Sequence, residues 1–253
     1  MTTLIQLQDV SVRYRLMSTR EHNLKRQVAN WFRHKPDRVR TVTALDSLTI
    51  NVEHGARVGL IGSNGAGKST LLQVMAGVLP PTSGVARIKG RPMALLGGAA
   101  AGLDGDASGT DNIVALGVQL GATPKQMAAL MDDIVEFSGL EARIDDPIFS
   151  YSSGMSARLR FATLTALRPD ILLLDEGIGT ADAAFNLRAK HRLDEFLSSA
   201  GVLVLASHSD DLIRETCSEA FWLEAGRLLA HGPVDEVLQL YRQVWSDDAL
   251  AGG

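Results

Sequence analysis

The sequence contains a single cysteine, Cys217, which excludes an internal disulfide scaffold and indicates a reducing cytosol. A lone cysteine is most often a buried thiol, and we expect Cys217 to be one. Long apolar runs are missing too, because Ile171–Leu174 and Val202–Ala206 are far shorter than the roughly 20 residues that cross a bilayer. The start, MTTLIQLQDV, lacks the cationic and apolar regions of a secretory signal. These absences predict a protein that stays inside the cell.

An excess of positive charge is also lacking. The 253 residues carry a formal net charge of -4, and 45% of them are hydrophobic. Nucleic-acid binding usually needs a basic domain or patch, so we predict no nucleic-acid partner. The apolar content is enough to bury the core of one large α/β domain or of two closely joined lobes.

Two kinds of hydrophobic period alternate along the chain. Leu4–Tyr14 and Ala44–Val52 alternate apolar and polar residues, which predicts strands of a sheet with one wet face. Val58–Ile61 leads into a Gly-rich turn and a helix, which is a βα unit of a parallel sheet. Ala225 and Gly226 predict a hairpin turn. Further strands are expected at 171–175 and 202–207, helices at 71–76, 111–120, 125–137, 152–167, 183–199, 209–216 and 234–244, and a frayed tail after Trp245.

These patterns predict an α/β fold with an inserted helical lobe. Residues 1–98 and 168–253 are expected to form a mostly parallel sheet core with an antiparallel β subdomain, and residues 99–167 the lobe. Residues 15–40, dense in Lys and Arg, are expected to form a basic amphipathic insertion between the first two strands.

A phosphate-binding loop follows the strand that ends at Ile61. Gly62, Gly67, Lys68 and Ser69 match the P-loop pattern GxxxxGK[ST] between a strand and a helix, a context that disfavours a chance Gly-rich turn. Glycines let backbone N–H groups and the helix N-terminus approach a phosphate, Lys68 adds positive charge, and the Ser69 hydroxyl can bind Mg²⁺. The predicted loop consists of Gly62, Ser63, Asn64, Gly65, Ala66, Gly67, Lys68, Ser69 and Thr70.

Two acidic residues end the apolar strand at 171–175. An acidic pair in this place is usually a helix N-cap, but beside a P-loop it resembles a Walker B motif at the carboxyl edge of a parallel sheet. Asp175 can then hold Mg²⁺, and Glu176 can orient and polarise the attacking water.

His208 follows the next apolar strand, VLVLASHS. A histidine at a strand end is usually structural. Its position one strand after Glu176 places it at the same sheet edge, where it could contact a γ-phosphate or act as an acid–base partner.

Together these motifs resemble the ATPase subunit of ABC transporters. The P-loop, YSSGM at 151–155, LLLDE at 172–176, Ala181-Asp182 and His208 stand in the family's order and cover most of the chain. The resemblance implies a RecA-like fold with ATP and Mg²⁺ as cofactors and Asp182 in the D-loop. It also implies a head-to-tail homodimer in which Ser152 and Gly154, with Ser153 and Met155 beside them, contact ATP on the opposite subunit.

The signature differs from the usual LSGGQ, because Tyr151, Ser153 and Met155 replace Leu, Gly and Gln. This variant, GTADAAF at 179–185 and the basic insertion are similar to ATPases that export polysaccharide, O-antigen and teichoic acid. That branch implies two copies of a membrane permease, a lipid-linked glycan as cargo, and a place on the cytoplasmic face of the cell membrane.

Two departures from the branch stand out. Gly97 and Gly98 occupy the place of the usual glutamine or glutamate after the strand near 94–96, so no side chain there can sense Mg²⁺. The chain also stops before the carbohydrate-binding β-sandwich of some members, so we expect no glycan recognition by that route.

Tyr14 ends the first strand where the family places an aromatic residue that stacks on adenine, and this role is favoured over the alternative of a core residue at a strand edge. Two rival functions remain: an ABC ATPase for a lipid or drug, against which the signature variant and basic insertion argue, and a soluble ABC ATPase of DNA repair or translation. The latter usually has two ATPase units or coiled-coil insertions, and neither is present here.

The basic insertion is either a solvated helix or a surface for anionic headgroups or the carrier-lipid diphosphate. If it contacts lipid or the lipid-linked glycan, neutralising Lys25, Arg26 and Arg33 should abolish export while basal ATPase activity persists. Export measured in cells, beside phosphate release by the purified protein, checks this expectation. Unchanged export would assign the segment to solvent.

Overall fold

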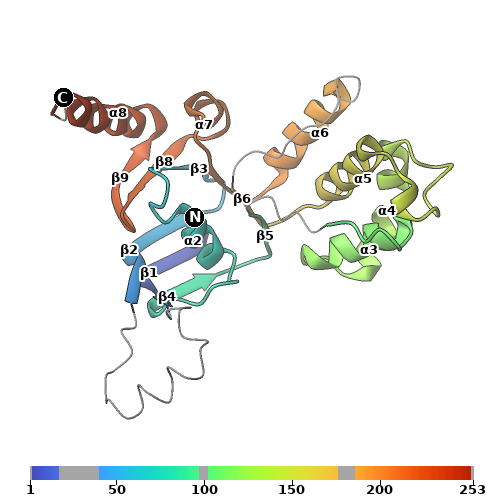
Figure 1. The fold of residues 1–253 in the computed structure, drawn as a ribbon, viewed down its shortest axis with the longest axis horizontal. Coiled ribbons are helices and arrows are strands. Elements are labelled where there is room, and N and C mark those ends of the chain that lie inside the picture. Colours follow the sequence, from blue (N-terminus) through green and yellow to red (C-terminus); the bar gives the residue numbers. More distant parts are fainter. Residues whose placement is uncertain (1, 17–39, 97–101, 176–185, 252–253) are drawn as a thin grey trace, which may run out of the picture.

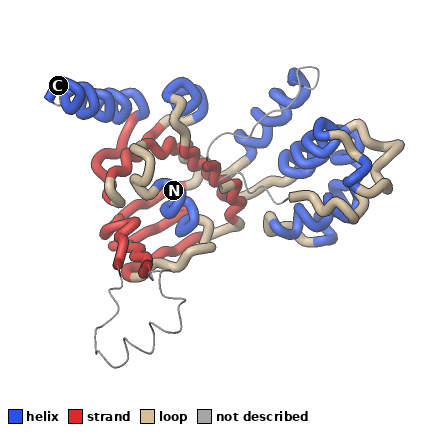
Figure 2. The backbone as a smooth tube through the Cα atoms, viewed as in Figure 1, coloured by secondary structure: helices blue, strands red, loops and turns tan. Residues whose placement is uncertain are grey.

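The computed structural model describes residues 2–16, 40–96, 102–175 and 186–251. Most of the basic insertion (17–39), Gly97, Gly98, Glu176 and Asp182 lie outside these residues. Figures 1 and 2 show a core of two sheets flanked by helices, with a separate group of helices at one end. The sheets have the strand orders β5-β6-β7-β3-β8-β9 and β2-β1-β4. The predicted α/β class with an antiparallel subdomain is therefore confirmed.

The three-stranded sheet is antiparallel and pairs distant parts of the chain. It consists of β1 (Thr3–Leu16), β2 (Arg40–Glu53) and β4 (Ser83–Ile88). The first two strands were expected from their alternation of apolar and polar residues. Strand β4 was missed because most of its residues are exposed. Buried side chains of β1 and β2, such as Ile5 and Leu45, pack in one cluster with helix α2 (Lys68–Met75) and with one face of the larger sheet.

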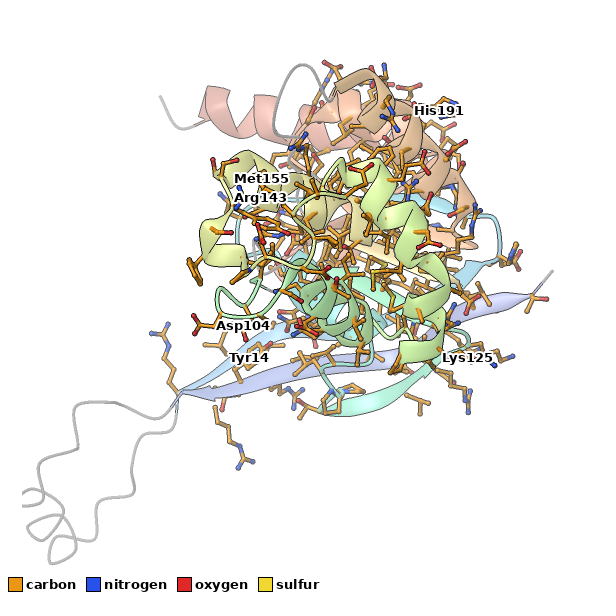
Figure 3. All side chains as sticks on the ribbon, turned by 90° about the vertical axis from the view of Figure 1, so that its right-hand side faces the viewer. Tyr14, Asp104, Lys125, Arg143, Met155 and His191 are labelled. Carbon is orange, nitrogen blue, oxygen red and sulfur yellow. The ribbon has the colours of Figure 1, made fainter. Side chains whose placement is uncertain are left out.

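The separate group of helices consists of α3 (Gly109–Gln119), α4 (Pro124–Ser138), the short 3-10 helix η2 (Ile148–Ser150) and α5 (Ser153–Ala166). Thr123 and Gln126 form a capping box that starts α4. Gly117 lets α3 approach α4 closely, since a Cβ there would lie 2.1 Å from the Met127 sulfur. Figure 3 looks onto these helices and shows Lys125 of α4 and Met155 of α5, with Asp104 and Arg143 on the adjoining loops, in front of the strand that carries Tyr14.

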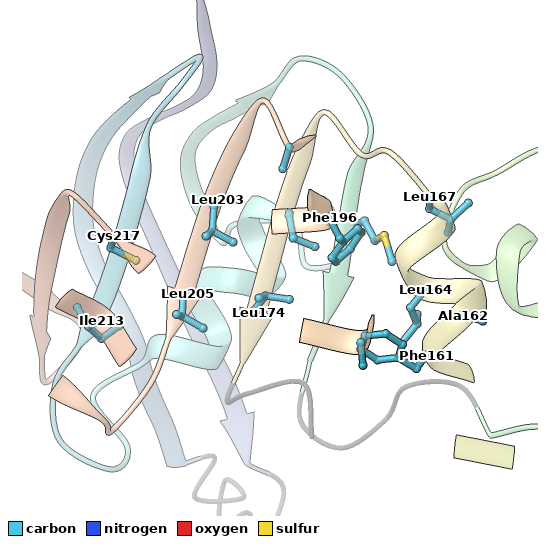
Figure 4. Close-up of a cluster of buried hydrophobic side chains, with 14 of the residues drawn as sticks. Phe161, Ala162, Leu164, Leu167, Leu174, Phe196, Leu203, Leu205, Ile213 and Cys217 are labelled. Carbon is cyan, nitrogen blue, oxygen red and sulfur yellow. The ribbon is translucent and has the colours of Figure 1, made fainter. Parts of the chain in front are cut away.

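The central strands of the larger sheet are buried on both faces, which explains their continuous apolar sequences. It contains β3 (Arg57–Ile61), β5 (Pro92–Leu95), β6 (Ile171–Asp175), β7 (Val202–Ala206) and β8 (Glu219–Glu224) in parallel, with β9 (Arg227–Pro233) antiparallel at its edge. Alternate residues face opposite clusters: Leu173 and Val204 face α2, whereas Leu174 and Leu205 face the helices on the other side (Figure 4).

Three further helices complete the fold. They are α6 (Asn186–Ser199), α7 (Asp210–Thr216) and α8 (Val234–Ala251). The expected fraying after Trp245 is wrong, because α8 continues to Ala251 and the chain offers no Gly or Pro before Gly252 to end it. The predicted hairpin turn is confirmed, with φ of 46° at Ala225 and 78° at Gly226. Among the described helices, none is long and apolar enough to span a membrane.

Cys217, 8% exposed, is the buried thiol expected from the sequence. Burial raises its pKa to about 12, so the nucleophilic thiolate is scarce at neutral pH. We expect N-ethylmaleimide to leave the native protein unmodified at about pH 8 and to modify it fully after unfolding in urea, as intact-mass spectrometry would measure. Rapid modification of the folded protein would contradict this burial.

Candidate nucleotide-binding site

Strand register brings three predicted motifs to one edge of the larger sheet. Asp175, the last residue of β6, lies opposite Ala206 of β7, and Ala206 lies opposite Leu60 of β3. The P-loop begins directly after Ile61, and His208 follows β7 by two residues. Because the strands are parallel, all three segments leave the sheet on the same side, which is where ligands bind in α/β sheets.

The P-loop follows a path that only glycine can take at two positions. Gly62 has φ of 145°, and a Cβ there would lie 2.0 Å from the carbonyl oxygen of Leu223. Gly67 has φ of 107° and is the N-cap of α2, where a Cβ would lie 2.5 Å from the carbonyl oxygen of Ala44. Since Gly67 has no side chain to cap the helix, the first amides of α2 remain available to a phosphate.

Lys68 lies along the inside of the loop. Its ammonium donates to the carbonyl oxygens of Gly62 at 2.7 Å and Ser63 at 2.9 Å, and the residue is only 9% exposed. A buried cation favours an added anion, because burial removes much of its hydration. The loop therefore combines a positive side chain with the uncapped amides at the start of α2.

A clamp on the P-loop was missed by the sequence analysis. Ser63 donates its hydroxyl to Glu224 at 2.5 Å, with its amide 3.4 Å from the same carboxylate. The next turn of the chain, at Gly226, donates its N–H to Ala66 and accepts one from Asp46, both at 2.8 Å. The β8–β9 hairpin thus anchors the loop at two points. The sequence identified this turn from Ala225-Gly226 but carried no signal for its partner.

The residues at the sheet edge fit a magnesium ion. Mg²⁺ binds oxygen ligands, usually one or two carboxylates together with water and substrate phosphates. Ser69 is exposed at the start of α2, and Asp175 is half-buried at the end of β6. No group of three or more His, Cys, Asp or Glu that could bind a metal occurs in the described ranges.

His208 is an exposed residue in a short, ordered connection. Ser207 accepts the N–H of Ser209 at 3.0 Å, and Ser209 caps α7 by accepting from Leu212 at 3.3 Å. This connection fixes the backbone of His208 beside the P-loop edge. The remaining predicted catalytic residue, Glu176, and the D-loop residue Asp182 lie outside the described residues.

The YSSGM segment forms the N-terminus of α5. Ser152 is the N-cap and accepts the N–H of Met155 at 3.2 Å, while Ser152 and Ser153 are exposed. Gly154 has no atom closer than 3.9 Å to where a Cβ would stand, so the helix end is uncluttered. Met155 packs partly against the core of the helical group.

Tyr151 explains one departure from the usual signature. Its hydroxyl donates to the carbonyl oxygen of Arg143 at 2.6 Å, and the Arg143 guanidinium lies 6.0 Å from the ring centre. Burial, with the nearby Asp146 carboxylate, raises the pKa of the Tyr151 phenol, which stays protonated and able to donate. This hydrogen bond ties Tyr151, which directly precedes Ser152, to the loop that contains Arg143.

The structure therefore gathers some predicted site residues and separates others. The P-loop, Asp175 and His208 share one sheet edge, whereas the N-terminus of α5 belongs to the helical group, apart from α2 in Figure 1. Tyr14 lies in β1, paired with Val42 and 38% exposed, so it is not a core residue. Asn64 and Gly65 are exposed at the loop tip, and Thr70 is half-buried in α2.

Comparison with known proteins identifies the family of this arrangement. The family model described as ABC transporter matches residues 45–179. An O-antigen export system ATP-binding protein of Yersinia enterocolitica is 39% identical over 89% of the chain and 96% of its own length. A second such protein, from Myxococcus xanthus, is 37% identical over 96% of the chain, which spans 56% of that relative. A teichoic acids export ATP-binding protein of Staphylococcus haemolyticus is 32% identical over 98% of the chain and 91% of its length.

Two solved structures share the fold at low sequence identity. One is the ATP-binding subunit of an ABC transporter, with a TM-score of 0.62 and 20% identity over 94% of this chain and 93% of that one. The other is a dimeric post-hydrolysis state of an ATP-binding cassette bound to ADP and Pi, with a TM-score of 0.62 and 17% identity over 91% and 98%. Family match, relatives and fold agree, so the chain belongs to the ABC transporter family and, within it, to the branch of O-antigen and teichoic-acid export ATP-binding proteins.

Proposed function

We propose that this chain is the ATP-hydrolysing subunit of an ABC exporter that moves a lipid-linked polysaccharide across the cytoplasmic membrane. The observation that carries the proposal is the shared sheet edge, where a cradle of backbone amides and Lys68 lies beside Asp175 and His208. Relatives that cover almost the whole chain are named for export of O-antigen and teichoic acid, and they support this class of cargo.

The P-loop binds the phosphates of ATP. Amides at the N-terminus of α2 bind the phosphate oxygens, and the Lys68 ammonium contacts them from inside the loop. Ser69 and Asp175 would hold Mg²⁺, which when bound neutralises part of the phosphate charge. The Glu224 clamp on Ser63 keeps the loop in this shape before ATP arrives, so little ordering is needed on binding.

Glu176 polarises the attacking water, because it follows Asp175 directly at the edge where the phosphates lie. His208 contacts the γ-phosphate from the neighbouring connection, and Asp182 has the D-loop role that the family resemblance implies. Tyr14 supplies the stacking surface for adenine, as its exposed position on β1 allows.

The N-terminus of α5 binds the ATP held by a second copy of the chain. It presents exposed Ser152 and Ser153 and a helix end that favours an anion, yet it lies apart from the P-loop of its own chain. A head-to-tail homodimer resolves this separation, because each copy completes the other's site. The dimer drives two copies of a membrane permease from the cytoplasmic face of the membrane.

Replacing Glu176 with Gln tests the hydrolysis step. Gln keeps the size of the side chain but cannot accept a proton, so ATP turnover should fall by about 10²–10⁴-fold while ATP still binds. Phosphate release and nucleotide titration measure the two effects, with the exposed Glu136→Gln as the matched control. Wild-type turnover in E176Q would remove Glu176 from this role.

Replacing Lys68 with Ala tests the phosphate cradle. Loss of a charged hydrogen bond to phosphate, worth about 1.5–3 kcal/mol, should weaken ATP affinity by roughly 10- to 100-fold. Titration with a fluorescent ATP analogue measures the affinity, and Lys125→Ala, at an exposed position of α4, is the control substitution. Equal affinity in K68A and the wild type would show that the loop does not bind the phosphates.

A further inference from the structure

Helix α6 is tied at one end to the strand that carries the P-loop. Arg57, the first residue of β3, donates to the carbonyl oxygens of Ser198 at 3.0 Å and Ala200 at 2.9 Å. These oxygens lie at the C-terminal end of α6, where unpaired carbonyls favour a cation. The end of α6 is therefore fixed to the sheet core.

The middle of α6 is tied to the helical lobe, defined here as α3, α4, η2 and α5. Arg192 donates to the Thr165 hydroxyl of α5 at 3.1 Å and to Asp133 of α4 at 3.0 Å, with a second, shorter bond to the other Asp133 oxygen. Its guanidinium also lies 4.3 Å from the centre of the Phe137 ring. One side chain thus contacts both α4 and α5.

The Arg192 side chain is less exposed than the arginine of any other described ion pair. The Arg192 side chain is 15% exposed, against 59% for Arg242 in its pair with Asp210. The hydrogen bond from Arg192 lowers the pKa of the Asp133 carboxyl, so the pair stays charged at neutral pH. The planar Arg192 guanidinium is bidentate to Asp133 along one edge and stacks on Phe137 with one face. This geometry fixes the angle between α6 and the helices that it contacts, which the single ammonium of a lysine cannot do.

The angle matters because Thr165 and Ser152 lie at opposite ends of α5. Their separation of 13 positions corresponds to about 20 Å along a helix. A tilt of roughly 10° about Thr165 would therefore move Ser152 by about 3–4 Å, more than a hydrogen bond tolerates. A small change at the Arg192 contact is amplified at the exposed N-terminus of α5.

We propose that Arg192 is a positioning residue that sets the orientation of the helical lobe, and with it the reach of Ser152 toward the ATP of the partner copy. This proposal rests on the proposed function, in which α5 acts on the second subunit. The contacts described for Arg192 are to Thr165, Asp133 and Phe137 of the helical lobe, so the residue should affect turnover and leave ATP binding by one subunit intact.

Turnover and ATP affinity are to be measured separately in R192A, R192K and D133N, with R242A as the matched control for an exposed arginine–aspartate pair. We expect R192A to lower kcat at least about tenfold, with ATP affinity of the isolated subunit within about twofold of the wild type. R192K should recover only part of the loss, because lysine lacks the fork and the stacking face. R242A should behave as the wild type.

D133N removes the charge of the Asp133 carboxylate and keeps the stacking of Arg192 on Phe137. Its kcat should therefore fall less than that of R192A. If R192A does not fold, D133N serves as the test variant. Unchanged kcat in folded R192A, or in D133N if R192A does not fold, overturns the inference, as does loss of ATP binding in either folded variant. S152A, measured in parallel, separates the two proposals. A wild-type kcat in S152A would refute the action of α5 on the partner. A reduced kcat in S152A together with a wild-type kcat in R192A would refute only the role of Arg192.

Discussion

Close approach of the P-loop to strand β8 is the constraint on which the nucleotide site depends. The carbonyl oxygen of Leu223 would lie only 2.0 Å from a Cβ at residue 62, so no side chain can be placed there. The chain can turn out of β3 only at a glycine, and this turn leads into the loop that ends at the N-terminus of α2. Glu224 and Gly226 then hold the loop from the β8 side, so the phosphate cradle is a joint product of two segments far apart in sequence.

Register in the parallel sheet explains how much of this site the sequence could predict. Parallel pairing of β3, β7 and β6 requires segments that follow apolar strands to emerge together, and this rule placed Lys68, Asp175 and His208 correctly at one edge. Strand β7 was predicted from its continuous apolar run and α4 from its helical period. Nothing local in the sequence marks β4 as a strand, because its partners in β1 are more than seventy residues earlier.

Contacts between segments account for what the sequence could not predict. Glu224 is one acidic residue among many until the fold brings it to Ser63, and Arg192 reads as a solvated charge on a polar helix. Tyr151 is similar: its departure from leucine looks like a loss of apolar packing, yet its hydroxyl gains the Arg143 carbonyl. Each of these side chains satisfies a partner whose position depends on tertiary structure alone.

The two lobes are joined by apolar packing that stabilises them and by polar contacts that orient them. One cluster of buried side chains runs from Leu203 in the sheet through Phe196 of α6 to Phe161 of α5 and the interior of the lobe. Such packing is strong but weakly directional, because dispersion and water exclusion change little when surfaces slide. Hydrogen bonds with fixed geometry restrict the angle instead. The proposed site, divided between two copies of the chain, would need both, since affinity for nucleotide would come from one lobe and alignment from the other.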